Sequence, residues 1–130
     1  MSKIVYICSA FRNDDPEIHL QNIDAAKMYS LLAMIYQGEY GKYIPITPHL
    51  LYPQFLDDTH PDDRDLGISA GLRLVGLCDE MWVFGKPTEG MEREIATAED
   101  HQIPIIYKQV TSEKLNDLCG HYRNKTRVGG

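Results

Sequence analysis

The chain has 130 residues, a formal net charge of −6 at pH 7 and a sequence pI near 5.2. This length fits one domain with a sizeable buried core, and the acidic balance argues against a nucleic-acid-binding surface as the main role. Hydrophobic residues make up 43% and charged residues 25% of the chain, as in ordinary soluble globular proteins, and no stretch approaches the roughly 18 consecutive apolar residues of a membrane-spanning helix.

The three cysteines, Cys8, Cys78 and Cys119, are widely separated and odd in number. They form neither a CxxC motif nor a zinc-like spacing, so we expect reduced thiols. The amino terminus runs directly into a strand-like segment and has no long hydrophobic signal region. The expected compartment is therefore the cytoplasm.

Strands and helices alternate along the predicted chain. Residues 3–8 (KIVYIC) are rich in β-branched and aromatic side chains, as in a buried strand. A polar loop at 9–14 leads to Asp15 and Pro16, a helix cap followed by proline at the first helical position. The spacing of the apolar residues then predicts a helix from 17 to 37.

A second short strand is predicted at 42–46, followed by a long irregular stretch at 45–65. A loop of this length is unusual in a compact domain and is more often functional, or partly helical, than idle. A further helical segment is predicted at 62–77, after His60 and Pro61.

The third predicted strand and the helix after it form the stretch around which the chain is organised. Residues 81–84 (MWVF) are an unbroken bulky apolar run, typical of a strand buried on both faces. Gly85 and Pro87 end this strand, and a helix is predicted from Glu89 with Thr88 as its cap. In an open α/β sheet such a junction lies at the carboxyl ends of the strands, where ligands bind.

A fourth strand at 103–107 and a closing helix at 112–119 complete the pattern, and 121–130 is expected to be a polar, loosely ordered tail after a domain at 1–120. Strands that alternate with helices, each strand a continuous apolar run, predict a parallel sheet covered on both faces. The predicted fold class is therefore α/β: a single-domain Rossmann-like (flavodoxin-like) three-layer sandwich with a four- to five-stranded parallel sheet.

Glu94 is the first candidate catalytic residue. It lies about one turn into its predicted helix, three positions from Met91 and four from Ala98, near the inward-facing side. Gly90 is a poor helix former near the helix start, which indicates that something approaches the backbone closely. A carboxylate over a pocket can stabilise or trap a sugar cation when a glycosidic bond breaks. The alternative is an ordinary capped helix with a glutamate in its first turns.

The loop at 9–13 is a second candidate site. It can offer backbone N–H groups to an anion, and Arg12 can add a bidentate clamp. An ordinary turn with a solvated arginine is the alternative. The chain contains neither a GxGxxG fingerprint nor a P-loop motif.

Acidic residues at 57–65 could in principle ligate a cation, but they lack EF-hand spacing. Asp62 and Asp63 are explained by the first turn of a helix, where the helix dipole favours negative charge. No metal site is predicted there. The histidines have no metal-ligand spacing, and we assign no catalytic role to His19, His49, His60, His101 or His121.

Three segments resemble the nucleoside 2-deoxyribosyltransferase superfamily, which includes the 2′-deoxynucleoside 5′-phosphate N-hydrolases. They are VYICSAFR at 5–12, the strand entry at Cys78 and Asp79, and PTxGxxxEIxxA at 87–98. The whole chain is also similar to uncharacterised bacterial and phage members of this group. The resemblance covers nearly the full length.

The resemblance implies that Glu94 is a nucleophile that takes the deoxyribosyl group and releases the base, with Tyr6 orienting it. Thr88 matches, as a conservative change, the serine that binds the 5′-phosphate in the N-hydrolases. Ser9 and Arg12 match the family's loop near the ribose and phosphate. A water acceptor would give hydrolysis, and a second base would give transfer.

The predicted site therefore has Glu94 and Tyr6 as its catalytic pair. The predicted substrate-binding residues are Ser9, Phe11, Arg12, Asp79, Thr88 and Gly90. We expect no metal and no cofactor. The expected partner is a small-molecule nucleoside or nucleotide, with no nucleic acid polymer and no membrane, and the resemblance implies a homo-oligomer, a dimer or larger.

Two positions depart from the family pattern. Gly71 stands where the family has an aspartate that handles the base or sugar, and Thr88 stands where the transferases have an aspartate that supports base exchange. Protonation of the base therefore lacks an obvious acid. Asp79, Glu92 and Asp65 are the candidate replacements.

Two main functions remain open. The first is cleavage of an N-glycosidic bond in a nucleoside or nucleoside 5′-phosphate, with hydrolysis preferred to transfer because Pro87 and Thr88 are closer to the N-hydrolase pattern. The second is a protein that binds a nucleotide derivative without turnover, for sensing or sequestering, which the Gly71 departure favours. A small α/β assembly subunit without a small-molecule role ranks last.

Overall fold

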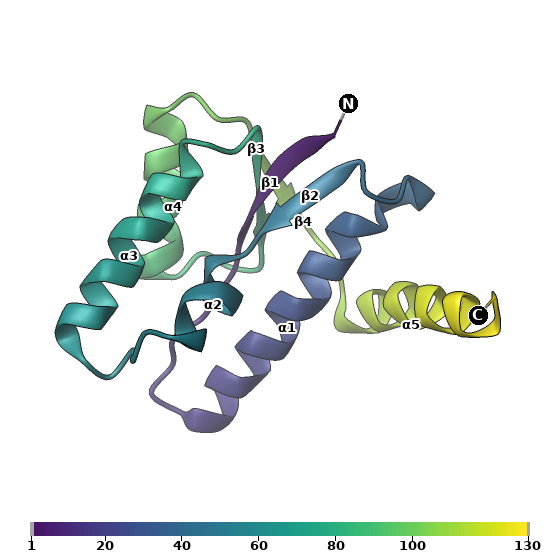
Figure 1. The fold of residues 1–130 in the computed structure, drawn as a ribbon, viewed down its shortest axis with the longest axis horizontal. Helices are drawn as coiled ribbons and strands as arrows, with labels where there is room; N and C mark the ends of the chain where they lie inside the picture. The colour runs from purple at the N-terminus through teal and green to yellow at the C-terminus, as the bar shows by residue number, and fades with distance from the viewer. Residues whose placement is uncertain (1, 130) are drawn as a thin grey trace.

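The computed structural model describes the backbone of residues 2–129 and the side chains of residues 2–124 (Figure 1). Within this part of the chain the strands are β1 (Lys3–Cys8), β2 (Tyr43–Ile46), β3 (Glu80–Phe84) and β4 (Ile105–Lys108). The helices are α1 (Pro16–Met34), α2 (Pro48–Leu51), α3 (Pro61–Val75), α4 (Glu89–Asp100) and α5 (Ser112–Gly129), with 3₁₀ turns η1 (Tyr36–Gly38) and η2 (Tyr52–Gln54). None of these described helices is long and apolar enough to cross a membrane.

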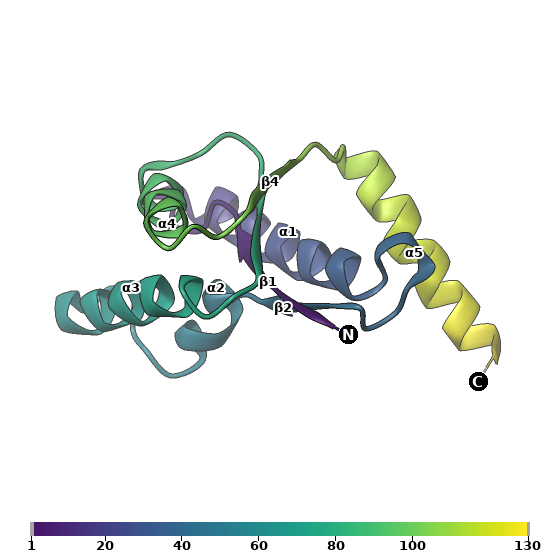
Figure 2. The same cartoon turned by 90° about the horizontal axis from the view of Figure 1, so that it is seen from above.

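The sheet is covered on both faces by helices, which Figure 2 shows nearly edge-on. The first core contains Tyr6, Cys8, Met81 and Val83 of the sheet together with residues of α3 and α4. The second core contains Val5, Ile7, Trp82 and Phe84 together with residues of α1 and α5. Successive residues of β1 and β3 thus enter opposite cores. This confirms the predicted α/β sandwich.

All strand pairs are parallel, and the spatial order is β2-β1-β3-β4. From β1 the chain passes through α1 to β2 on one side, and then returns through α2 and α3 to β3 on the other side of β1. In parallel sheets, ligands bind outside the carboxyl ends of the strands where the winding changes direction. That point lies between β1 and β3.

The local signals at the helix starts agree with the sequence prediction. The Asp15 side chain accepts a hydrogen bond from the Glu17 N–H at 2.9 Å, and the Thr88 hydroxyl accepts one from the Met91 N–H at 3.3 Å. Both are N-cap contacts. Gly85 has a φ of 79°, which favours glycine and turns the chain between β3 and α4.

The closing helix is longer than predicted. α5 continues to Gly129, beyond the predicted bounds of 112–119. Leu115 and Cys119 are buried on the side that faces the second core. Tyr122 lies one turn further along and packs edge-on against Tyr40, with ring centroids 5.4 Å apart. The apolar spacing therefore extends past the predicted end, and it keeps the helix against the domain.

The long stretch after β2 is partly helical. It contains α2 and η2, which lie between β2 and the start of α3. The described structure thus confirms that residues 45–65 are more than an unstructured loop. Residues of this segment line the cavity described below.

Candidate functional site

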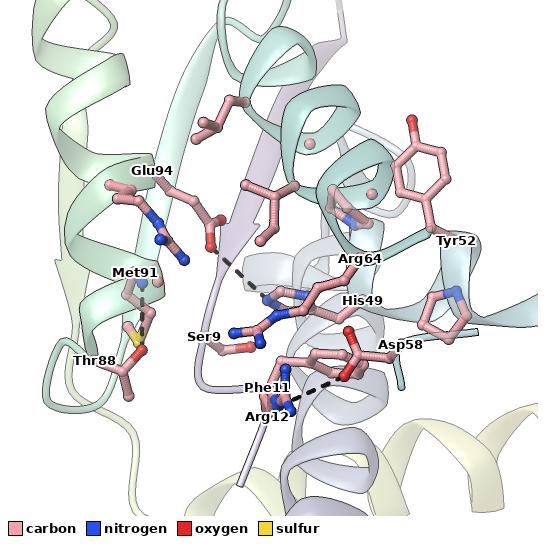
Figure 3. Close-up of a pocket in the computed structure, with 18 of the residues that line it drawn as sticks. Ser9, Phe11, Arg12, His49, Tyr52, Asp58, Arg64, Thr88, Met91 and Glu94 are labelled. Carbon is pink, nitrogen blue, oxygen red and sulfur yellow. Dashed lines mark hydrogen bonds and ion pairs between the residues drawn. The ribbon is translucent and has the colours of Figure 1, made fainter. Parts of the chain in front are cut away.

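A cavity of about 630 Å³ lies at the carboxyl ends of β1 and β3 (Figure 3). Its walls come from the loop after β1, from α2 and the segment that follows it, from α3, and from the first turns of α4. This volume is in the range of small-molecule sites. The position is the one that the parallel winding predicts.

Glu94 reaches into this cavity from the second turn of α4 (Figure 3). The residue is 8% exposed, and its Oε2 atom has no hydrogen-bond partner among the described residues. Burial raises the pKa of Glu94 to about 7, while the neighbouring Tyr6 and Arg93 act in the opposite direction. A buried carboxyl oxygen that lacks a partner destabilises a fold. Its presence therefore points to a functional role.

Tyr6 stands next to Glu94 at the centre of the sheet. Burial raises the pKa of Tyr6 well above its ordinary value, and the charge and hydrogen bonding of Glu94 raise it further. The hydroxyl is therefore protonated at neutral pH and can donate toward the carboxyl. α3 approaches the same place, because a Cβ added at Gly71 would lie 3.5 Å from the Tyr6 hydroxyl oxygen.

His49 is a site residue that the sequence did not predict. Its Nε2 atom lies 3.9 Å from Glu94 Oε1, and its ring stacks on Phe11 with centroids 4.5 Å apart and an interplanar angle of 6°. Burial lowers the pKa of His49 to about 4, although hydrogen bonding to the Ser9 backbone opposes this. His49 is thus neutral at neutral pH, and its contact with Glu94 is not an ion pair.

Three arginines line the cavity: Arg12 after β1, Arg64 on α3 and Arg93 on α4. Arg12 Nε lies 3.9 Å from Asp58 Oδ2, and both side chains are partly exposed, so this pair contributes little to stability. The Arg64 side chain extends into the cavity (Figure 3), and it makes no ion pair within the described residues. Arg64 was not among the predicted site residues.

The start of α4 offers a polar corner of the cavity. Thr88 caps the helix, and helix N-termini favour anions. Ser9, which is 3% exposed, lines the same cavity, and its Oγ atom has no partner among the described residues. A Cβ added at Gly90 would meet only Arg93, at 3.8 Å. The protein itself therefore does not require glycine there.

Most predicted site residues come together in this cavity. Its lining includes Tyr6, Ser9, Phe11, Arg12, Thr88, Gly90 and Glu94. Asp79 does not belong to this group, and its assignment to the substrate site is corrected. It precedes β3, at the opposite end of the sheet, where Asp79 Oδ2 accepts the Ile4 N–H at 2.7 Å. Asp65 and Glu92 are also absent from the lining.

The acidic stretch before α3 has a structural explanation. Asp57 Oδ1 accepts the N–H of Thr59 at 3.0 Å and its hydroxyl at 2.6 Å, and Asp63 Oδ2 accepts the Asp57 N–H at 2.9 Å. These contacts shape the turn that leads into the helix. Among the described residues, no group of three or more histidine, cysteine or acidic side chains is arranged to hold a metal ion.

Comparisons with known proteins agree with this fold. A family model described as a domain of unknown function (DUF7768) matches residues 3–108. No curated protein matches the chain significantly. Among solved structures, the chain is similar to a 2-deoxyribosyltransferase from the psychrotolerant bacterium Bacillus psychrosaccharolyticus, with a TM-score of 0.53 and 11% identity over 88% of this chain and 80% of that one. At this identity the likeness shows the shared fold.

Proposed function

We propose that this chain, which belongs to the DUF7768 family, cleaves the N-glycosidic bond of a nucleoside or nucleoside 5′-phosphate. The observation that carries the proposal is the buried Glu94 carboxyl, which enters the cavity with no hydrogen-bond partner on Oε2 among the described residues. The 2-deoxyribosyltransferase with a similar fold supports it at the level of the fold alone. Carboxylates at such positions are suited to glycosidic chemistry.

In the first step, an oxygen of Glu94 bonds to the sugar C1′ while the C1′–N bond breaks and its electron pair leaves with the base. Tyr6 acts as a positioning residue, because its hydroxyl remains protonated and interacts with the Glu94 carboxyl. The product is a glycosyl ester on Glu94. The site must therefore present Glu94 in its ionised form, which a pKa of about 7 permits for roughly half the molecules at neutral pH.

In the second step, water attacks C1′ and the ester bond breaks, which returns the sugar with a new hydroxyl group. The water loses one proton. It passes to the Glu94 carboxylate or to His49 Nε2, which lies 3.9 Å from Glu94 Oε1. Hydrolysis is preferred to base transfer because the Pro87–Thr88 pattern is closer to the N-hydrolases.

The remaining lining supports the binding of a nucleotide. The stacked rings of Phe11 and His49 offer a flat face to a base. Ser9, Arg12 and Thr88 are our proposed contacts to the ribose and the 5′-phosphate, at the end of the cavity where α4 begins.

A binding protein without turnover is the second candidate. Gly71 brings no side chain to the surroundings of Tyr6, and the three candidate acids Asp79, Glu92 and Asp65 do not line the cavity. A neutral leaving base would thus depart without an identified acid. For any substrate whose base must be protonated before it leaves, this favours binding without turnover.

The proposal also includes the oligomeric state and the cellular compartment. The domain at 1–120 is expected to act as a homo-oligomer, a dimer or larger, in the cytoplasm of a bacterium or a phage-infected cell. The cysteines Cys8, Cys78 and Cys119 are unpaired and buried, in agreement with a reducing compartment.

The test is incubation of the pure protein with a panel of nucleosides and 5′-nucleotides, with free base measured by chromatography, beside Glu94→Gln. Base release by the native chain is expected to fall by about 10³-fold or more in this near-isosteric variant, since the nucleophile is lost. If no compound releases base but a nucleotide raises the melting temperature of both proteins, the enzyme is excluded and the binding protein is supported.

A further inference from the structure

Among the residues that the structure describes, the surroundings of Glu94 contain no group suited to protonate a leaving base. β1 contributes Tyr6 and Cys8, α2 contributes His49, α4 contributes Arg93, and α3 contributes Gly71, which has no side chain. Burial raises the pKa of both Tyr6 and Cys8 above their ordinary values, so both hold their protons tightly. His49 has a pKa of about 4, so it has no proton to give at neutral pH.

The other acidic side chains of the lining are engaged or exposed. Asp58 is paired with Arg12, and Asp63 accepts the Asp57 N–H, so both act as hydrogen-bond or charge acceptors. Asp14 and Glu89 lie exposed at the rim. None of the four takes the place of an acid beside Glu94.

We propose that the substrate is a phosphorylated N-glycoside whose leaving base already carries a positive charge, of the ribosyl-pyridinium class, so that its departure requires no acid. This rests on the proposed function and names the substrate class of the same site. The C1′–N bond breaks, its electron pair stays on the ring nitrogen, and the pyridinium becomes a neutral pyridine. An oxygen of Glu94 bonds to C1′ in the same step, and no proton moves.

The charges of the site agree with this substrate. A negative carboxylate and a positive ring become a neutral ester and a neutral base, and a buried site with few hydrogen-bond partners favours the loss of both charges. A cationic ring next to Glu94 also favours the ionised carboxylate that must attack. Glu94 thus becomes fully active when this substrate is bound.

The flat face formed by Phe11 and His49 suits a cationic ring. The two rings are stacked at 4.5 Å, and an aromatic face attracts a cation. A protonated histidine would repel a pyridinium, whereas burial keeps His49 neutral. The neutral form of His49 therefore allows a cationic ring to bind next to it.

The cavity also has positively charged side chains that can bind the phosphate. Arg12, Arg64 and Arg93 line the same cavity, and Arg64 makes no ion pair within the described residues. The unpartnered Ser9 hydroxyl and the capped start of α4 add uncharged donors. A nucleotide is consequently expected to be preferred to the matching nucleoside.

The experiment compares two classes of substrate at equal concentrations. Nicotinamide mononucleotide and NAD⁺ carry a cationic leaving base, and AMP and dAMP carry a neutral one. Free nicotinamide and adenine are measured by chromatography with the native chain and with Glu94→Gln. We expect nicotinamide release at least about 10²-fold faster than adenine release, which is the lower range of what a general acid contributes, and loss of both in the variant.

Gly71→Asp and Gly71→Asn form a matched pair of variants. An added Cβ would make only ordinary contacts, at 3.5 Å to the Tyr6 hydroxyl and 3.8 Å to Pro48 Cβ, and the two side chains have nearly the same size, so their steric effects are matched. Only the aspartate can supply a proton. The ratio of adenine release to nicotinamide release is expected to rise in Gly71→Asp relative to Gly71→Asn.

Each outcome separates the two proposals. If AMP or dAMP is cleaved as fast as the nicotinamide compounds, and Glu94→Gln abolishes this, the inference is overturned while N-glycosidic chemistry stands. If none of the four compounds releases base but another nucleoside or nucleotide of the panel does, the inference alone is overturned, and if no compound of the panel releases base, both are overturned. An equal ratio in the two Gly71 variants, with folded proteins by melting temperature, would also contradict the absence of an acid as the basis of selectivity.

Discussion

Glu94 combines a proposed catalytic role with a cost to the stability of the fold. Its carboxyl is buried, and Oε2 has no partner among the described residues, so the ionised form is disfavoured. An acid kept near half ionisation at neutral pH can both attack as a carboxylate and take up a proton afterwards. These two requirements of the proposed reaction explain why the Glu94 carboxyl is buried although its burial lowers the stability of the fold.

Glu94→Gln is expected to be more stable than the native chain, increasingly so at higher pH. The folded-state pKa is raised from 4.5 to about 7, so the folded carboxyl keeps a proton that the unfolded one loses. The native chain therefore retains its full stability below pH 4.5 and loses up to about 3 kcal/mol as the pH rises through 7.

Urea unfolding of both proteins at pH 5 and pH 8 measures this effect. The difference in the free energy of unfolding between variant and native chain should grow between the two pH values. A difference that is the same at both would show that Glu94 titrates normally in the folded state.

His49→Phe tests the role of the Nε2 atom apart from that of the ring. Phenylalanine can still stack on Phe11, but it has no atom to accept a proton next to Glu94. With nicotinamide mononucleotide, we expect a rapid burst of base release followed by slower turnover, because Glu94 is then the one of the two proposed proton acceptors that remains for the second step. Stopped-flow or quench measurements separate the burst from steady turnover. Slowing of the burst itself would instead place His49 in the first step.

At the scale of elements, the start of α4 combines a structural cap with a proposed binding surface. Thr88 accepts the Met91 N–H, which leaves other donors of the first turn without a helical partner. Gly90 lies in that turn and lines the cavity. Glycine is a poor helix former, so its presence here fits close approach by a ligand.

Gly90→Ala is therefore expected to raise the stability of the fold and to weaken ligand binding. The added Cβ would meet only Arg93, at 3.8 Å, so the free energy of unfolding should rise by up to about 1 kcal/mol from helix propensity. The methyl group would hinder a phosphate at the helix start, and the affinity for nicotinamide mononucleotide should fall. Thermal unfolding and titration calorimetry measure the two effects. Unchanged affinity would place the phosphate away from α4.

The strands show which element predictions depend on local pattern. Residues 3–8 were predicted as a strand with the bounds that the structure has, because a run of β-branched and aromatic residues indicates a buried strand by itself. The end of α5 was missed, because the continuation depends on the packing of Tyr122 against Tyr40, which belongs to a distant segment.

For the whole molecule, the surface leaves several large apolar side chains exposed. Phe55 is 67% and Leu66 is 61% exposed, and these residues lie after η2 and on α3, in the segment that also contributes to the cavity wall. Large exposed apolar side chains can contribute to association between copies.

The native chain is accordingly expected to sediment as a dimer or larger species at micromolar concentration. The double variant Phe55→Ser and Leu66→Ser should shift it toward the monomer with little change in melting temperature, since both side chains are already solvated. Analytical ultracentrifugation measures both proteins. A native chain that sediments as a monomer would contradict the expected homo-oligomer.

The sequence by itself determined the class of fold and the edge of the sheet at which to look. Apolar runs, caps and turn residues act locally, and parallel winding brings the ends of successive strands to one edge, so Ser9, Thr88 and Glu94 could be placed near that edge from the pattern, whereas Tyr6 entered only through the family resemblance. Asp79 also came from the resemblance, but it precedes its strand and so lies at the other edge.

The contacts and pKa values of the side chains at that edge depend on the tertiary structure. The contact of His49 with Glu94, the direction of Arg64 and the empty position at Gly71 depend on how α2 and α3 pack over the carboxyl ends of the strands. The pKa values of Glu94 and His49 follow from burial, which is the sum of what every surrounding segment covers. The burial of these two side chains therefore cannot be predicted from the periodicity or spacing of a single segment.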